Sequence, residues 1–175
     1  MSDPVTLRRA TAEDLDELVA LWSHYIREHQ NDSAYRRLPP DALEKRREVF
    51  ARRLEDPDCA IFVLARPDGG LDGMITCFVE ENEPYFLPRC YARLQVPFVR
   101  PDARRRGRLR MLLEAAFRWA REQEMTELRL YTGADNLPAN TLAEELGFQA
   151  IEVVRRHTLD WRRPPESQVE GDSRW

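Results

Sequence analysis

Apolar residues recur every three to four positions in two early segments, residues 15–26 and 43–54, as on one face of an α-helix. The first segment follows Thr11 with an acid three residues later, Asp14, a combination typical of a helix N-terminus. A shorter apolar stretch at residues 5–7 has the character of a strand. The beginning of the chain therefore predicts a strand followed by two amphipathic helices.

In the middle of the chain the pattern changes to short apolar runs separated by turn residues. Residues 60–65 and 73–79 flank the turn at residues 67–70 and predict a β-hairpin. Residues 91–99 are a further strand candidate, and this one contains Pro97. Because proline has no N–H to donate to a neighbouring strand, Pro97 indicates an edge, a β-bulge or a strand that leaves its neighbour.

Helical spacing returns in the second half of the chain. Apolar residues between Leu109 and Ala120 follow the helical period and predict the clearest helix of the protein. A strand is expected next, at residues 128–131. It is followed by a short helix, because Pro138 lies near a helix start and Gly147 lies just past its end.

Two further strands are expected at residues 148–154 and 157–160. The whole order predicts an α/β fold with one mixed, mostly antiparallel twisted sheet of six to seven strands, flanked by about four helices. We expect a single domain over residues 1–161. Residues 162–175 are polar, contain proline and lack periodicity, so a disordered C-terminal tail is expected there.

Composition narrows the class of protein. The 175 residues are 42% hydrophobic and 33% charged, which is ordinary for a globular domain, and no apolar run reaches the length of a transmembrane helix. The N-terminus lacks the apolar core of a signal peptide, so we expect a cytoplasmic protein without a membrane partner. The three cysteines are too few and too scattered for a disulfide framework or a zinc site, and no metal is expected.

The charge is unevenly distributed along the chain. A net charge of −4 argues against general nucleic-acid binding, yet residues 100–110 carry six arginines around Gly107. This run comes directly before the clearest predicted helix, whose N-terminal N–H groups and dipole favour an anion such as phosphate. A solvated basic loop with a turn glycine explains the run equally well, and the run alone does not decide between the two.

A second segment, residues 136–148, favours the phosphate site. The two segments together resemble the GNAT superfamily of acetyl-CoA-dependent N-acetyltransferases. In that family a strand ending V-x-P precedes R/Q-x-x-G-x-G/A at a helix start, and N-x-x-A and L-G-F come later. The resemblance covers residues 5–160, and the motifs occur in the family's order. The matching residues are Val99 and Pro101, Arg104 and Gly107, Asn136 and Ala139, and Leu146, Gly147 and Phe148.

The resemblance implies acetyl-CoA as co-substrate, with its pyrophosphate on the backbone N–H groups of residues 104–110 and arginine side chains nearby. The pantetheine arm is expected along the strand that ends at Val99, in a gap between it and residues 128–131. Asn136 would hydrogen-bond the arm, and a helix cap explains this residue equally well. The implied cofactor-binding residues are Phe98, Val99, Arg104, Arg105, Arg106, Gly107, Arg108, Leu109, Arg110, Asn136 and Ala139.

Three positions depart from the family's pattern. Leu109 replaces the last small residue of the phosphate loop, although its side chain fits the apolar stripe of the helix. Pro97 has no N–H where the family offers one to the acetyl carbonyl, unless a bulge brings another amide, such as that of Phe98, into place. Ala143 stands where the family often has a tyrosine that protonates the departing thiolate. Substitutes for that tyrosine are Tyr131, Tyr85 and Tyr91, which the sequence does not rank.

The general base is unassigned by the sequence. An alkylammonium must lose a proton before it attacks, and the strand before the phosphate loop carries Gln95 where family members often have an acid. Candidates are Glu80 and Glu81, and His29 on the apolar face of the first helix, each with a simpler role as a surface acid or a semi-buried histidine. The acidic segment around Glu80 also favours a cationic small-molecule acceptor.

These features predict an N-acetyltransferase that moves an acetyl group from acetyl-CoA to a primary amine of a small molecule or peptide, by direct attack in a ternary complex. The departures leave an alternative, an acyl-CoA-binding sensor or interaction module of the same fold with weak activity. Nucleic-acid binding through the arginines is a weaker interpretation, because no aromatic residues are interleaved with them. A homodimer is expected from the family's habit alone.

Overall fold

The computed structural model describes residues 4–29 and 38–157. Its helices and strands lie within a few residues of the positions that the hydrophobic pattern predicts, apart from the two strands expected after residue 147. In chain order the elements are β1 (Thr6–Arg9), α1 (Leu15–Glu28), α2 (Ala42–Glu55), β2 (Cys59–Ala65), β3 (Leu71–Glu81), β4 (Cys90–Val99), α3 (Arg108–Glu122), β5 (Leu128–Leu130) and α4 (Leu137–Glu145).

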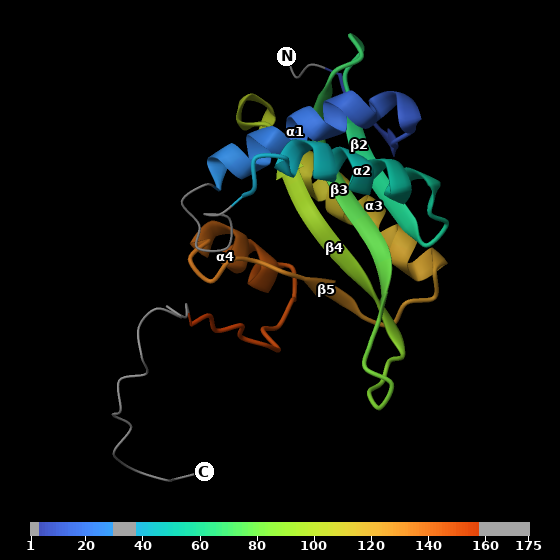
Figure 1. The fold of residues 1–175 in the computed structure, drawn as a ribbon, viewed down its shortest axis with the longest axis vertical. Coiled ribbons are helices and arrows are strands. Elements are labelled where there is room, and N and C mark those ends of the chain that lie inside the picture. Colours follow the sequence, from blue (N-terminus) through green and yellow to red (C-terminus); the bar gives the residue numbers. More distant parts are fainter. Residues whose placement is uncertain (1–3, 30–37, 158–175) are drawn as a thin grey trace.

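One sheet holds the strands in the order β1-β2-β3-β4-β5 (Figure 1). Neighbouring strands from β1 to β4 pair antiparallel, and β5 pairs with β4 in parallel. The predicted α/β fold with a mixed, mostly antiparallel sheet is confirmed. The predicted six to seven strands are wrong for the described residues, in which the sheet has five.

The two strands expected after α4 account for that difference. Residues 148–154 are described and carry no strand, and Val154 among them is 87% exposed. The adjacent edge strand, β5, has three residues, so it offers few ladder positions, and a strand without a partner is not stable in water. Of the strand expected at residues 157–160 only His157 is described, outside any strand; its remainder and the expected tail at 162–175 lie outside the described residues.

Helices α1 and α2 cover one face of the sheet, and α3 covers the other (Figure 1). Alternate residues of each strand therefore enter two separate cores. Burial of one large apolar side chain contributes about 1.5–3 kcal/mol, so the two cores fix the sheet as a rigid platform. The α3 core includes Leu64, Ile75, Leu94, Leu112, Ala116 and Trp119, and the α1–α2 core includes Leu18, Leu21, Phe50, Val63, Met74 and Phe98.

A β-bulge interrupts β4 at Pro97, one of the three possibilities that the sequence left open. Thr76 of β3 pairs with Gln95 and Met74 pairs with Phe98, so Val96 and Pro97 lie together opposite a single residue of β3. Val96 has φ of 54°, a left-handed conformation that a β-branched side chain rarely adopts. Strain of this kind persists only where the surrounding structure enforces it, and it concentrates at functional sites.

β4 and β5 run together for a short distance and then separate. Their parallel pairing covers three positions and ends at Leu94 and Leu130, whereas β4 continues to Val99. Arg100 N–H donates to the Asp72 carbonyl at 2.8 Å, which identifies these two as a hydrogen-bonded pair of the β3–β4 ladder. By the alternation of such a ladder, the N–H and C=O of Val99 point away from β3, toward the gap beside β5.

Candidate active site

A cavity of about 560 Å³ lies where β4 and β5 separate. The end of α1, the second half of β4, the arginine-rich loop, the end of β5 and α4 form its walls. None of the described residues that line it is an aspartate or a glutamate. We call the part beside residues 104–110 the phosphate end, and the part beside Arg93, Gln95 and Tyr131 the acceptor end.

The phosphate end is built from the start of α3. Gly107 caps this helix with φ of 72°, and Arg105 two residues earlier has φ of 61°. The N–H of Met111 reaches back to the Gly107 carbonyl at 3.1 Å, so the N–H groups of residues 108–110 have no acceptor within the helix. Backbone N–H groups on left-handed loop residues and at a helix start form a concave site that suits a phosphate.

A buried ion pair holds this loop in place. Arg108 Nη1 lies 2.5 Å from Asp72 Oδ2, and both side chains are almost inaccessible, at 3% and 5% exposure. Asp72 also contacts Arg66 at 3.4 Å, and its carbonyl accepts from Arg100 on the other side of the loop. Asp72 therefore ties β3 both to the end of β4 and to the first residue of α3. The Arg108 side chain points into the protein, which leaves its backbone as the part that faces a ligand.

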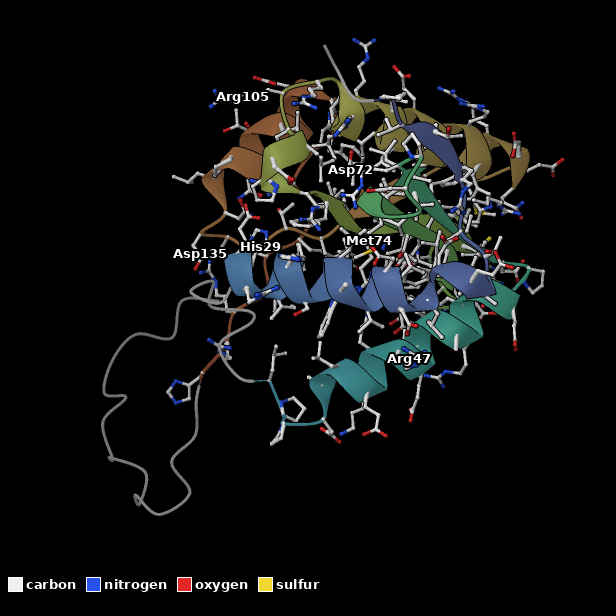
Figure 2. All side chains as sticks on the ribbon, turned by 90° about the horizontal axis from the view of Figure 1, so that it is seen from above. His29, Arg47, Asp72, Met74, Arg105 and Asp135 are labelled. Atoms are coloured by element: carbon white, nitrogen blue, oxygen red, sulfur yellow. The ribbon has the colours of Figure 1, made fainter. Side chains whose placement is uncertain are left out.

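Arg104 connects the phosphate end to α1. Its Nε donates to the outward-pointing Val99 carbonyl at 2.9 Å, and its Nη2 lies 2.5 Å from Glu28 Oε2 near the end of α1. The hydrogen bond from Arg104 holds the pKa of Glu28 below its usual range. Figure 2 shows His29 at the same end of α1, with Arg105 directed outward from the loop.

The cofactor-binding residues that the family resemblance implied come together in this cavity with one exception. Arg106 is exposed and does not line it. Leu109 is half-buried and packs against the α3 core, as its place in the apolar stripe predicts. The Asn136 side chain accepts from the Ala139 N–H at 3.3 Å, so it caps α4 while lining the cavity. The others that line it are Phe98, Val99, Arg104, Arg105, Gly107, Arg108, Arg110 and Ala139.

The base candidates are not equally placed. His29 lines the cavity, with its ring 4.5 Å from that of Tyr25, which also lines it. Glu80 lies outside the lining, and both of its oxygens accept from Arg93 Nη1 at 2.9 Å. Glu81 is exposed and faces Cys90 at the far end of β4. Of the three candidates only His29 reaches the cavity, and Glu80 is engaged by an arginine rather than open to a cation.

The three candidate tyrosines also differ in whether they reach the cavity. Ala143 lines the cavity, as expected for the position of the family's tyrosine, and Tyr131 lines it from the end of β5. Burial and a hydrogen bond with Tyr131 raise the pKa of Tyr91 to about 12. Tyr85 is 74% exposed in the loop between β3 and β4. Tyr131 is therefore the tyrosine of the three that can reach a ligand in the cavity.

The buried cysteines are poor nucleophiles. Burial raises the pKa of the Cys59 thiol to about 11 and that of the Cys77 thiol further. No cysteine lines the cavity among the residues described. Within the same residues there is no cluster of side chains suited to a metal ion, and no helix has the length and apolarity to cross a membrane.

Sequence reasoning missed three polar residues that shape this site. They are Asp72 behind the phosphate end, and Arg93 and Arg53 at the acceptor end. A signal was present for two of them. Asp72 interrupts an otherwise apolar strand, and Arg93 alternates with Gln95 on one face of β4, where an ordinary buried strand would be apolar.

Known proteins share this architecture. An apo aminoglycoside 6'-N-acetyltransferase from Acinetobacter haemolyticus has 20% identity and a TM-score of 0.68, over 89% of this chain and 98% of its own. The aminoglycoside N-acetyltransferase AAC(6')-Iy, in complex with a CoA-containing bisubstrate analogue, has 21% identity and a TM-score of 0.69 over the same shares. A Clostridium acetobutylicum protein described as a predicted acetyltransferase, with acetyl-CoA, has 13% identity and a TM-score of 0.73, over 89% and 96%. At these identities the likeness shows the fold.

No curated protein matches the sequence at a significant level. The family model described as Acetyltransferase (GNAT) family matches residues 17–148, which include the bulged strand, the arginine-rich loop and α4. The chain thus belongs to the GNAT family of acetyltransferases.

Proposed function

We propose that this protein transfers an acetyl group from acetyl-CoA to a primary amine, by direct attack within a ternary complex. The observation that carries the proposal is one continuous cavity between two diverging strands, with a helix N-terminus and arginines at one end and Arg93, Gln95 and Tyr131 at the other. Acetyl-CoA supplies an acetyl group activated as a thioester. Every other requirement falls on residues of this chain.

The phosphate end is suited to hold the pyrophosphate. The backbone N–H groups of residues 108–110 and the side chains of Arg105 and Arg110 supply donors, and each charge-assisted bond is about twice as strong as a neutral one. The outward N–H and C=O of Val99 are available to an amide of the pantetheine arm, as a neighbouring strand would use them. Arg104 fixes that carbonyl from the loop side.

We assign proton transfer to two side chains that line the cavity, His29 and Tyr131. His29 would accept the proton that an ammonium acceptor must lose, after which the amine nitrogen bonds to the acetyl carbon and the carbon–sulfur bond breaks. Tyr131 would give a proton to the departing thiolate, in place of the tyrosine missing at Ala143, and the second proton that the nitrogen loses on becoming an amide would restore the Tyr131 hydroxyl. A positioned acid or base contributes about 10²–10⁴-fold to the rate.

Pro97 affects how the acetyl carbonyl oxygen is stabilised during the transfer. Its missing N–H removes one donor from the bulge, and the ladder alternation directs the Phe98 N–H toward β3 rather than the cavity. Loss of one such donor costs about 10²–10³-fold in comparable enzymes, so a modest turnover number is expected.

Pro97 and Ala143 also support the alternative, a sensor that binds acyl-CoA and turns over poorly. The first experiment separates cofactor binding from fold alone. We expect acetyl-CoA and desulfo-CoA at about a hundred times Kd to stabilise the protein by about 2.7 kcal/mol, several degrees in Tm, while ATP has little effect.

Absence of any shift at millimolar ligand contradicts the cofactor site. A shift without release of free thiol, in the presence of a broad panel of amines, selects the sensor over the enzyme.

A further inference from the structure

The acceptor end of the cavity carries an excess of positive charge. Arg93 lines it, and none of the described lining residues is acidic. Arg93 belongs to the sheet face that α1 and α2 cover, together with Phe78 and Gln95, whereas the phosphate end leads into α3 on the opposite face. Its charge is therefore separate from that of the loop expected to hold the pyrophosphate.

Arg93 is held in one orientation by its neighbours. Its guanidinium lies 4.1 Å from the centre of the Tyr131 ring, and its Nη1 donates to Glu80. Its Nε is buried, so a ligand in the cavity meets the exposed part of the side chain, which is 27% of it. A carboxylate that accepts from this part forms a charge-assisted hydrogen bond.

A second arginine, Arg53, approaches the same Phe78 ring as Arg93. The Arg53 guanidinium of α2 lies 4.3 Å from the centre of the Phe78 ring, and Arg93 approaches the same ring at 5.8 Å. Arg53 Nη1 donates to Gln95 Oε1 at 2.6 Å, and Gln95 lines the cavity. Burial, and to a smaller extent the charge of Arg93, lower the pKa of Arg53.

The charges around Phe78 do not balance. Among the described residues, Glu80 forms its ion pair with Arg93, and Arg53 forms none with any carboxylate. Arg93 and Arg53 thus have one ion-paired carboxylate between them, with Asp56 acting on Arg53 from further away, at the wall of a cavity whose described lining residues include no acid. Such a site repels a polycation and attracts an anion, and an arginine edge matches a carboxylate with two parallel hydrogen bonds.

We propose that the acetyl acceptor is an amine that also carries a carboxylate, and that Arg93 binds this carboxylate with Arg53 and Gln95 supporting it. The inference rests on the proposed acetyl transfer and names its acceptor class. It replaces the cationic acceptor that the acidic segment around Glu80 suggested, because Glu80 is bound by Arg93 and Glu81 lies away from the cavity. It also sets this chain apart from its structural neighbours that acetylate aminoglycosides, which are polycations at neutral pH.

Matched pairs of amines test the acceptor class without any mutation. Glycine, β-alanine, 4-aminobutyrate, 6-aminohexanoate, phenylalanine and glycylglycine would each be offered beside the corresponding carboxamide, with spermidine and kanamycin as polycations. Thiol release and product mass are measured with saturating acetyl-CoA. We expect at least one carboxylate to exceed its carboxamide by about 10- to 100-fold in kcat/KM, the range of a hydrogen bond to a charged group.

Variants then test whether Arg93 is responsible for the preference for a carboxylate. Arg93→Met should bring each pair to near equality by raising KM for the carboxylate member, Arg93→Lys should retain part of the preference, and KM for acetyl-CoA should stay unchanged in both. Arg118→Met, on the exposed side of α3, is the control for loss of an arginine elsewhere. Melting temperatures check that each variant is folded.

The outcomes are distinct. Carboxamides or polycations acetylated as well as the carboxylates overturn this inference and leave the acetyltransferase proposal standing, as does a preference that survives in a folded Arg93→Met variant. No thiol release with any amine overturns both.

Discussion

The two ends of the cavity are built in different ways. The phosphate end consists of consecutive residues, 104–110, and presents mainly backbone N–H groups. The acceptor end gathers Arg53, Phe78, Arg93 and Tyr131 from α2, β3, β4 and the end of β5. One end therefore depends on the conformation of a single loop, and the other on the packing of four elements.

The difference extends to how each end treats its charges. At the phosphate end the Asp72–Arg108 pair is fully enclosed and serves to hold backbone in place. At the acceptor end the Glu80–Arg93 pair remains 31% and 27% exposed, and the arginine faces the cavity. A buried pair is expensive to break and an exposed one is not, so the two pairs separate positioning from recognition.

Breaking the two pairs should give the largest contrast. Asp72→Leu leaves the Arg108 charge buried without its closest partner and should cost about 3–5 kcal/mol in the free energy of unfolding. Glu80→Gln at the acceptor end should cost less than about 1 kcal/mol. Urea unfolding measures both.

The double variant Asp72→Leu with Arg108→Leu is the matched control, because it removes both charges and should recover most of the lost stability. Equal losses for Asp72→Leu and Glu80→Gln would mean that the two ends are not held differently.

A second contrast lies in catalysis. Tyr131→Phe removes the proposed proton donor and should lower kcat by about 10²-fold or more, while KM for acetyl-CoA stays unchanged. Tyr85→Phe in the exposed loop between β3 and β4 should leave kcat as it is. Steady-state kinetics with the best acceptor measures both. Wild-type kcat in Tyr131→Phe would remove this tyrosine from the reaction.

Two glycines with positive φ allow a matched test of the phosphate end. Gly107 and Gly69 have φ of 72° and 87°, and a Cβ at either meets nothing within 4 Å. Alanine at each should therefore cost a similar strain, about 1–2 kcal/mol. Only Gly107→Ala places a methyl group where the pyrophosphate is expected, and it alone should weaken acetyl-CoA binding, by about tenfold in calorimetry. Equal affinities in the two variants would move the phosphate site elsewhere.

The smallest effect concerns the contact between α1 and the loop. The Arg104 hydrogen bond lowers the pKa of Glu28 in the folded protein, so it stabilises the fold above the unfolded pKa of about 4.3. That contribution is lost as the pH falls through the lower folded value. Because the pair is partly exposed, Glu28→Gln should cost less than about 1 kcal/mol at pH 7, and the cost should decrease as the pH falls below the unfolded pKa. Urea midpoints across this range check it, and a difference that grows toward low pH would contradict the assigned sign.

Much of the fold could be predicted from the sequence, because its signals are local. Apolar periods and runs indicated α1, α2, α3 and the five strands, and Pro138 with Gly147 indicated α4. Thr11 with Asp14 marked the start of the first helix, where the Thr11 N–H donates to Asp14 Oδ2 at 2.8 Å. The prediction of strands after α4 was wrong for the described residues, for a reason that a local sequence pattern does not record. Strand formation needs a partner edge, and β5 offers a short one.

The sequence by itself indicated the loop at residues 104–110 of the phosphate end, because a glycine and a helix start are local signals, while the Asp72 carboxylate that holds Arg108 comes from β3. Only the tertiary structure decided the acceptor end. The bulge at Val96 sets which side chains of β4 face α1 and α2, and strand register then brings Arg93 to Glu80, while helix packing brings Arg53 to Gln95. Such contacts join residues up to 42 positions apart, and their energy depends on geometry that no local pattern records.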